Sequence, residues 1–167
     1  QDAKNDLQKG KQKDAAQKEK SAAKKMREAA QKMEESLKEE EKKRKSEDHD
    51  AIRALLENLI DISHRQEKVF TELKTLKEDN PRILSLNKEQ INLKEISKTL
   101  EDSLMTLAKR QPMVSNLVTK EISRINDNMQ LALDNLKVRQ IQKSAMYEQY
   151  IMTGFNNLAV MLMESLK

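Results

Sequence analysis

From residue 52 onward, apolar side chains recur at alternating steps of three and four residues, the spacing that places them along one face of an α-helix. Leu56, Ile60 and Phe70 widen this face beyond the seam of a two-stranded coiled coil, which indicates contact with two or more neighbouring helices. Pro81 ends the pattern, because the residue before a proline is pushed out of the helical region. The first seam is Ile52, Leu55, Leu59, Ile62, Gln66, Val69, Leu73 and Leu76.

A second seam of the same spacing follows and stops before Pro112. Folding the chain back around residues 79–81 brings the two seams together along their length, so the sequence predicts an αα-hairpin. The second helix begins either at Pro81 or near Asn87. Its seam is Leu86, Gln90, Leu93, Ser97, Leu100, Leu104 and Leu107.

Two further amphipathic segments follow Pro112, a residue suited to the first turn of a helix. The polar stretch Arg139–Ser144 forms either a turn between them or the middle of one long helix. With a turn, the chain is an all-α, antiparallel up-down-up-down bundle over residues 51–167; without one, three longer helices pair with a second copy. The predicted bundle segments are about 52–78, 86–110, 113–138 and 141–166.

Residues 1–50 differ from the rest, because Lys, Glu, Gln and Ala dominate them. Glu residues precede Lys by four positions repeatedly, as in Glu34/Lys38 and Glu41/Lys45, a pairing that supports an exposed helix. The sequence predicts a long N-terminal helical or coiled-coil extension. Its row of apolar side chains along one helical face is too narrow to hold a fold alone, so this arm frays or docks on a partner. The candidate docking residues are Met26, Met33 and Leu37.

The amino-acid composition excludes several fold classes and several kinds of functional site. Aromatic residues make up 2% of the 167 residues and charged residues 36%, and two glycines and two prolines are too few for the turns of a β-protein. The absence of cysteine excludes disulfide scaffolds, Cys-ligated zinc and thiol catalysis. No apolar run reaches the 18 residues of a membrane-spanning helix. The start at Gln1, without a targeting pattern, suggests a piece of a longer chain.

Candidate catalytic and metal-binding groups are sparse. The two histidines are His49, in the solvated-looking run Glu47–Asp50, and His64, which forms a single Asp-x-x-His spacing with Asp61. We therefore expect no enzyme activity, no metal and no cofactor. A net charge of +4 spread over 32 basic and 28 acidic residues, without interleaved aromatics, argues against nucleic acid as a partner.

Four polar residues occupy seam positions where leucine would be more stable. Buried polar groups of this kind can set the register between helices at a cost in stability. We expect Gln66 and Gln90, which lie near the turn of the hairpin, to set its register. The full set is Gln66, Gln90, Ser97 and Glu148.

Two stretches carry a family resemblance: Leu100–Leu104 running into Ala108–Pro112, and Asn156–Ala159 followed by Met161 and Leu162. They resemble the helical region of large, uncharacterised, membrane-anchored coiled-coil envelope proteins of Bacteroidota, over about residues 51–167. The resemblance implies a periplasmic or cell-envelope location and carries no catalytic residues.

Together these features predict a non-enzymatic structural or interaction module of a larger, envelope-associated protein. Its partner would be another protein or a second copy, bound through long helices. The alternatives are a peripheral membrane or lipid-binding helical protein, which would favour anionic lipid, and a holdase-like chaperone that clamps clients between helices.

Overall fold

The computed structural model describes residues 2–110 and 112–166, with side chains described for 2–110 and 115–166. Four α-helices account for these ranges: α1 (Asp2–Thr75), α2 (Arg82–Arg110), α3 (Pro112–Lys137) and α4 (Ile141–Ser165). No strand occurs within them. The all-α helical fold predicted from the apolar spacing is confirmed.

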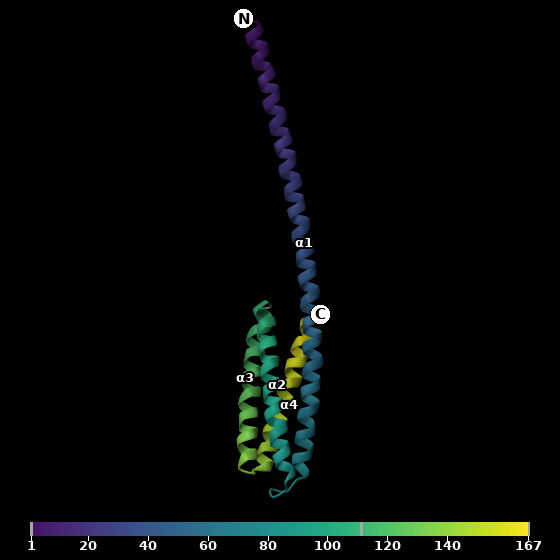
Figure 1. Cartoon of the computed structure of the whole chain (residues 1–167), viewed down its shortest axis with the longest axis vertical. Helices are drawn as coiled ribbons and strands as arrows, with labels where there is room; N and C mark the ends of the chain where they lie inside the picture. Colours follow the sequence, from purple (N-terminus) through teal and green to yellow (C-terminus); the bar gives the residue numbers. More distant parts are fainter. Residues whose placement is uncertain (1, 111, 167) are drawn as a thin grey trace. The chain divides into compact units, whose positions relative to one another are not determined.

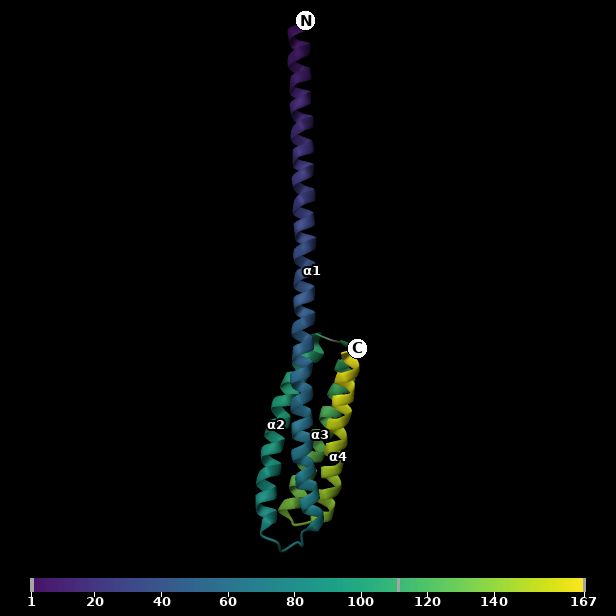
Figure 2. The same ribbon diagram turned by 90° about the vertical axis from the view of Figure 1, so that its right-hand side faces the viewer.

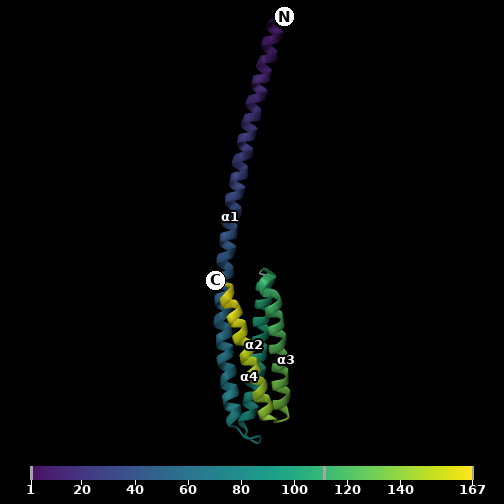
Figure 3. The ribbon, with the colours of Figure 1, turned by 180° about the vertical axis from the view of Figure 1, so that it is seen from behind.

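The chain divides into two compact units, residues 1–47 and residues 48–167, which we call the N-terminal segment and the bundle. In the bundle, the end of α1 and the other three helices run alternately down and up (Figure 1). α1 lies between α2 and α4 in Figure 2, and the view from behind in Figure 3 shows α4 between α1 and α3. The helices therefore form a closed antiparallel ring in chain order.

Hydrogen bonds join each pair of neighbours in this ring. Side chains connect α1 to α2 through Gln66 and Gln90, and α1 to α4 through Ser63 and Asn156. α2 contacts α3 through Glu101 and Asn126, and α3 contacts α4 through Glu121 and Asn157. The contact between Gln66 and Gln90 is buried in the core, whereas the other three lie nearer the surface around it.

Most of the core consists of the seam residues read from the sequence, because one apolar face per helix points inward. The core also includes Ile83 and Ala108, which lie outside the predicted seams, whereas the seam residue Leu76 is only half-buried. Phe155 is the one aromatic side chain among the fully buried ones, and leucine, isoleucine and methionine fill most of the rest. Val114 falls four residues before the buried Val118 and so belongs to the same predicted apolar series, but it lies outside the residues whose side chains are described. The largest fully buried side chains are Phe155, Ile52, Leu59, Ile62, Leu73, Leu93, Leu104, Leu107, Ile125, Met129, Leu136 and Ile151.

Local capping sets the connection between α1 and α2. The Asn80 side chain accepts a hydrogen bond from the backbone N–H of Arg82 at 2.9 Å, so it caps the new helix. α2 consequently begins at Arg82, close to the earlier of the two predicted starts, rather than at residue 86. α1 ends at Thr75, before the predicted residue 78.

The stretch Arg139–Ser144 contains a turn only in its first two residues, and α4 begins at Ile141. The backbone N–H groups of Arg139 and Gln140 donate to the carbonyls of Leu136 and Asn135 at 3.0 and 2.9 Å, a Schellman closure of α3. Arg139 adopts the left-handed conformation that this closure requires, with φ of 58°. Its guanidinium donates to the Glu78 carbonyl at 2.6 Å, which ties the two turns together.

The N-terminal segment is helical from Asp2, and every described residue in it is exposed. Two of the predicted ion pairs form along it, Lys38 with Glu34 at 2.6 Å and Lys45 with Glu41 at 2.9 Å. The division between the units falls after Glu47, slightly before the predicted boundary at residue 50.

Candidate functional site

The most unusual part of the bundle is a cluster of three polar side chains in its core. Gln66 of α1, Gln90 of α2 and Glu148 of α4 are each 0% exposed. Gln66 Nε2 donates to Gln90 Oε1 at 2.8 Å, and Gln90 Nε2 donates back to Gln66 Oε1 at 3.2 Å. Gln66 Nε2 also donates to Glu148 Oε2. One hydrogen-bonded unit therefore joins three of the four helices.

The amide of Gln90 can serve either charge state of Glu148. In the orientation described above, Gln90 Oε1 lies 3.1 Å from Glu148 Oε2, so a protonated Glu148 carboxyl group can donate a hydrogen bond to it. With the amide turned over, Gln90 Nε2 lies 3.1 and 3.3 Å from the two carboxylate oxygens and can donate to them, but it then faces Gln66 Nε2 at 2.8 Å, so the hydrogen bonds between the two glutamines are lost. Gln90 can therefore pair with Gln66 and a protonated carboxyl group, or with the charged carboxylate at the expense of its hydrogen bonds to Gln66.

Burial decides which protonation state of Glu148 is favoured. It raises the pKa of Glu148 well above its ordinary value of 4.5, because removing the carboxylate from water destabilises the charged form. The amide donors oppose this effect, but they are neutral, and desolvation is the dominant cause. The protonated form of Glu148 is therefore stabilised in the folded bundle.

The sequence identified the three residues but did not predict that Glu148 contacts the two glutamines. Gln66, Gln90 and Glu148 stood out as polar residues on apolar seams, and the expected partnership was between the two glutamines. That partnership is present as a hydrogen bond. Glu148 is remote in sequence from both, so only the packing of α4 beside α1 brings it into contact.

No protein-family model, curated protein or solved structure matches this chain.

A second polar contact lies beside Gly154, where α4 approaches α3 closely. Glu121 is 8% exposed and accepts a hydrogen bond from Asn157 Nδ2 at 3.1 Å, while Arg124 Nη1 lies 3.7 Å from its other oxygen. Gly154 allows this approach: a Cβ atom there would lie 2.5 Å from Ile125 Cγ1, nearer than van der Waals contact permits. Neither Glu121 nor Gly154 was singled out from the sequence, since neither interrupts an apolar seam.

Replacing Gly154 with alanine is expected to lower the free energy of unfolding by up to about 2 kcal/mol. Overpacking a tight core costs about 1–3 kcal/mol, partly offset by the roughly 1 kcal/mol gain in helix propensity. Ile125 is only 1% exposed, so it has little room to move. The check is urea unfolding followed by circular dichroism.

Gly10→Ala is the matched control, because a Cβ at Gly10 meets no atom within 4 Å. It is expected to raise helix content without lowering the urea midpoint. Equal destabilisation by both substitutions would contradict a packing role for Gly154.

The acidic run before the bundle differs from its expected environment. Asp48 was expected in solvent, yet it is 8% exposed, and its Oδ1 lies 3.0 Å from Arg110 Nη1 at the end of α2. The predicted exposure of Asp48 is wrong because the bundle begins one helical turn earlier than the apolar pattern does. His49 and His64 are exposed.

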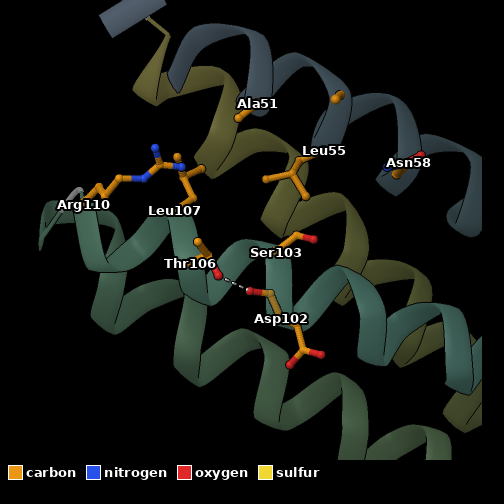
Figure 4. Close-up of a pocket in the computed structure, with 9 residues that line it drawn as sticks. Ala51, Leu55, Asn58, Asp102, Ser103, Thr106, Leu107 and Arg110 are labelled. Atoms are coloured by element: carbon orange, nitrogen blue, oxygen red, sulfur yellow. Dashed lines mark hydrogen bonds between the residues drawn. The ribbon is translucent and has the colours of Figure 1, made fainter. Parts of the chain in front are cut away.

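An open groove of about 450 Å³ runs between α1 and α2 near this ion pair (Figure 4). Leu55 and Leu107 lie between the two helices, and Asp102, Ser103 and Thr106 follow one side. The Thr106 hydroxyl donates to the backbone carbonyl of Asp102 at 2.8 Å, a bond within the helix. These polar groups therefore lie along the surface of α2 and do not converge on a common point.

The remaining chemical candidates are limited in the described part of the chain. No group of three or more His, Asp or Glu side chains there is placed to hold a metal ion. No helix among residues 2–110 and 112–166 is both long and apolar enough to cross a membrane.

The predicted docking residues lie on the N-terminal segment. Met26, Met33 and Leu37 are 73%, 70% and 66% exposed. They share one helical face with Ala22, Ala29 and Ala30, because these positions fall within about 100° of arc at 3.6 residues per turn. We call this set of six residues the stripe.

Proposed function

We propose that this protein is a non-enzymatic structural and interaction module, in which the bundle is a rigid body and the N-terminal segment binds another protein helix. The observation that carries the proposal is the stripe. Three large apolar side chains, each about two-thirds exposed or more, follow one face of a regular helix. A helix whose residues are all exposed gains stability by burying such a face against a partner helix.

The bundle supports the proposal from the other side. Its core is filled by interlocking apolar side chains, and the Gln66–Gln90–Glu148 cluster ties three helices into one arrangement. A body built in this way transmits position and force without having to open. Catalysis would need convergent reactive groups in a pocket, whereas the polar groups of the bundle are hydrogen-bonded to one another.

We further propose that the module belongs to a larger, coiled-coil protein of a bacterial envelope. The support for this setting is the resemblance to such proteins of two stretches, Leu100–Leu104 running into Ala108–Pro112 and Asn156–Ala159 followed by Met161 and Leu162. The partner is then a protein at the envelope or a second copy of the chain.

Photo-crosslinking in cells that make the protein tests the proposal. A photoreactive amino acid replaces Met26 or Met33, and the control positions are Leu84 and Val160 of the bundle, which are 65% and 51% exposed. We expect covalent protein adducts from the stripe positions only. Adding Leu37→Gln should reduce their yield several-fold, since it removes apolar area next to the probe.

Protein adducts of equal yield at stripe and control positions, or none at the stripe, would rule out the interaction role. Lipid adducts at the stripe in place of protein would instead support the peripheral membrane protein.

A further inference from the structure

The stripe has an internal symmetry that bears on what covers it. Its centre lies between Ala29 and Ala30, and Met26 and Met33 are equally distant from that centre. Ala22 and Leu37 form the next symmetric pair outward. Read from either end, the stripe therefore presents a small residue or leucine, then methionine, then alanine.

The charges of the same segment are arranged about the same centre with opposite sign. Residues 18–25 hold four lysines and one glutamate, a net charge of +3. Residues 34–41 hold five glutamates and one lysine, a net charge of −4. The two blocks are equally distant from the Ala29–Ala30 centre.

We propose that two copies of this chain pair through their N-terminal segments in antiparallel orientation, with the two-fold axis at Ala29 and Ala30. This inference rests on the proposed function and names the partner as a second copy. Met26 of each chain packs against Met33 of the other, and Ala22 packs against Leu37. The pairing covers residues 18–41, about 36 Å of helix at 1.5 Å per residue.

Electrostatics selects the orientation. Antiparallel pairing at this register places each +3 block beside a −4 block, twice per dimer. Parallel pairing in register places like charges together along the same length, which is unfavourable at separations near the Debye length of about 8–10 Å. Single exposed ion pairs contribute little, so the effect lies in avoiding repulsion between whole blocks.

Packing agrees with the same register. Alanines at the centre allow the two helices to approach closely, at the short end of the 8–10 Å range for packed helices. Methionine and leucine then fill the space on both sides, and each large residue faces another chain's methionine or alanine. The flexible methionine side chain adapts to such a site without a fixed shape.

Disulfide trapping of the full chain tests the orientation, since the natural sequence has no cysteine. Two single variants, Ala22→Cys and Leu37→Cys, are purified with tags of different mass. In the antiparallel dimer, position 22 of one copy lies beside position 37 of the other. The two positions 22 are then 15 residues apart, about 22 Å, far beyond the roughly 7 Å limit between Cα atoms for a disulfide.

We expect the mixture of both variants to form the mixed disulfide at least tenfold faster than either variant alone forms its own. Sedimentation equilibrium should show a dimer of the natural chain. Met26→Gln with Met33→Gln and Leu37→Gln should weaken that dimer at least tenfold, while Leu84→Gln with Val160→Gln and Met163→Gln, exposed residues of the bundle, should leave it unchanged.

Two results would overturn the inference. Faster disulfide formation within each single variant would show a parallel dimer, and a natural chain that stays monomeric at about 100 µM would show that a second copy does not cover the stripe. In both cases the crosslinking of the stripe to protein in cells stands or falls independently, so failure of this inference is distinguishable from failure of the proposed function.

Discussion

Replacing Glu148 with glutamine is expected to stabilise the bundle by about 1–3 kcal/mol at neutral pH, the range for the desolvation cost of one buried polar group. Burial holds the pKa of Glu148 well above its ordinary 4.5. Above pH 4.5 the unfolded chain releases this proton while the folded chain retains it. The folded state therefore binds more protons, and stability falls as pH rises.

The slope of this loss is at most about 1.4 kcal/mol per pH unit for one proton, and it levels off once pH exceeds the raised pKa. Glutamine has no proton to release and can still share hydrogen bonds with Gln66 and Gln90. Urea unfolding between pH 5 and 9 should show the slope in the natural chain and its loss in Glu148→Gln.

Glu57→Gln is the matched control, because Glu57 is an exposed glutamate of the bundle part of α1. It should leave both stability and slope nearly unchanged. A Glu148→Gln protein with the same pH slope as the natural chain would show that Glu148 ionises as freely in the folded state as in the unfolded one.

Removing both glutamines while keeping Glu148 is expected to destabilise the bundle by about 2–4 kcal/mol at neutral pH. In Gln66→Leu with Gln90→Leu, the carboxyl group of Glu148 stays fully buried and loses the donors that contact it. Leaving one buried polar group without partners costs about 1–3 kcal/mol, and more when it is charged. Urea unfolding at pH 7 measures the loss.

Adding Glu148→Leu should reverse the sign. With all three positions apolar, the bundle is expected to exceed the natural chain in stability by about 1–4 kcal/mol, as when buried polar networks are replaced by packed hydrophobic residues. A triple variant less stable than the double variant would contradict the view that the cluster is maintained at a cost.

The same triple variant tests whether the cluster sets the register of α1 against α2. Spin labels at Lys68→Cys and Lys88→Cys, two exposed positions, report the distance between these helices. We expect one narrow distance in the natural background and a broader or divided distribution in the triple variant. A single unchanged distance would mean that apolar packing alone defines the register.

The helices could be predicted well from the sequence, and particular residues show why. Ile52, Leu59 and Leu73 are buried as their spacing indicated, because helical periodicity is a local property of the chain. Helix ends were less predictable. The start of α2 depends on a cap from Asn80, and the end of α3 depends on Arg139 adopting a conformation more typical of glycine.

The candidate site could be predicted only in part. Gln66 and Gln90 were identified as polar residues on facing seams, since an αα-hairpin forces its two seams together. Gly154 and Asp48 gave no signal, because an ordinary-looking residue becomes special only when a neighbouring helix approaches it.

The sequence by itself therefore determined the all-α class, the inward faces of the helices and the position of the polar seam residues, since each follows from spacing along one helix. It also carries the symmetric stripe of the N-terminal segment. Only the tertiary structure decided that Glu148 joins Gln66 and Gln90, that Asp48 is buried beside Arg110, and that Gly154 lies against Ile125. Those contacts depend on which helices are neighbours and at what register they pack. The apolar spacing within one helix does not encode the distance to a residue on another helix.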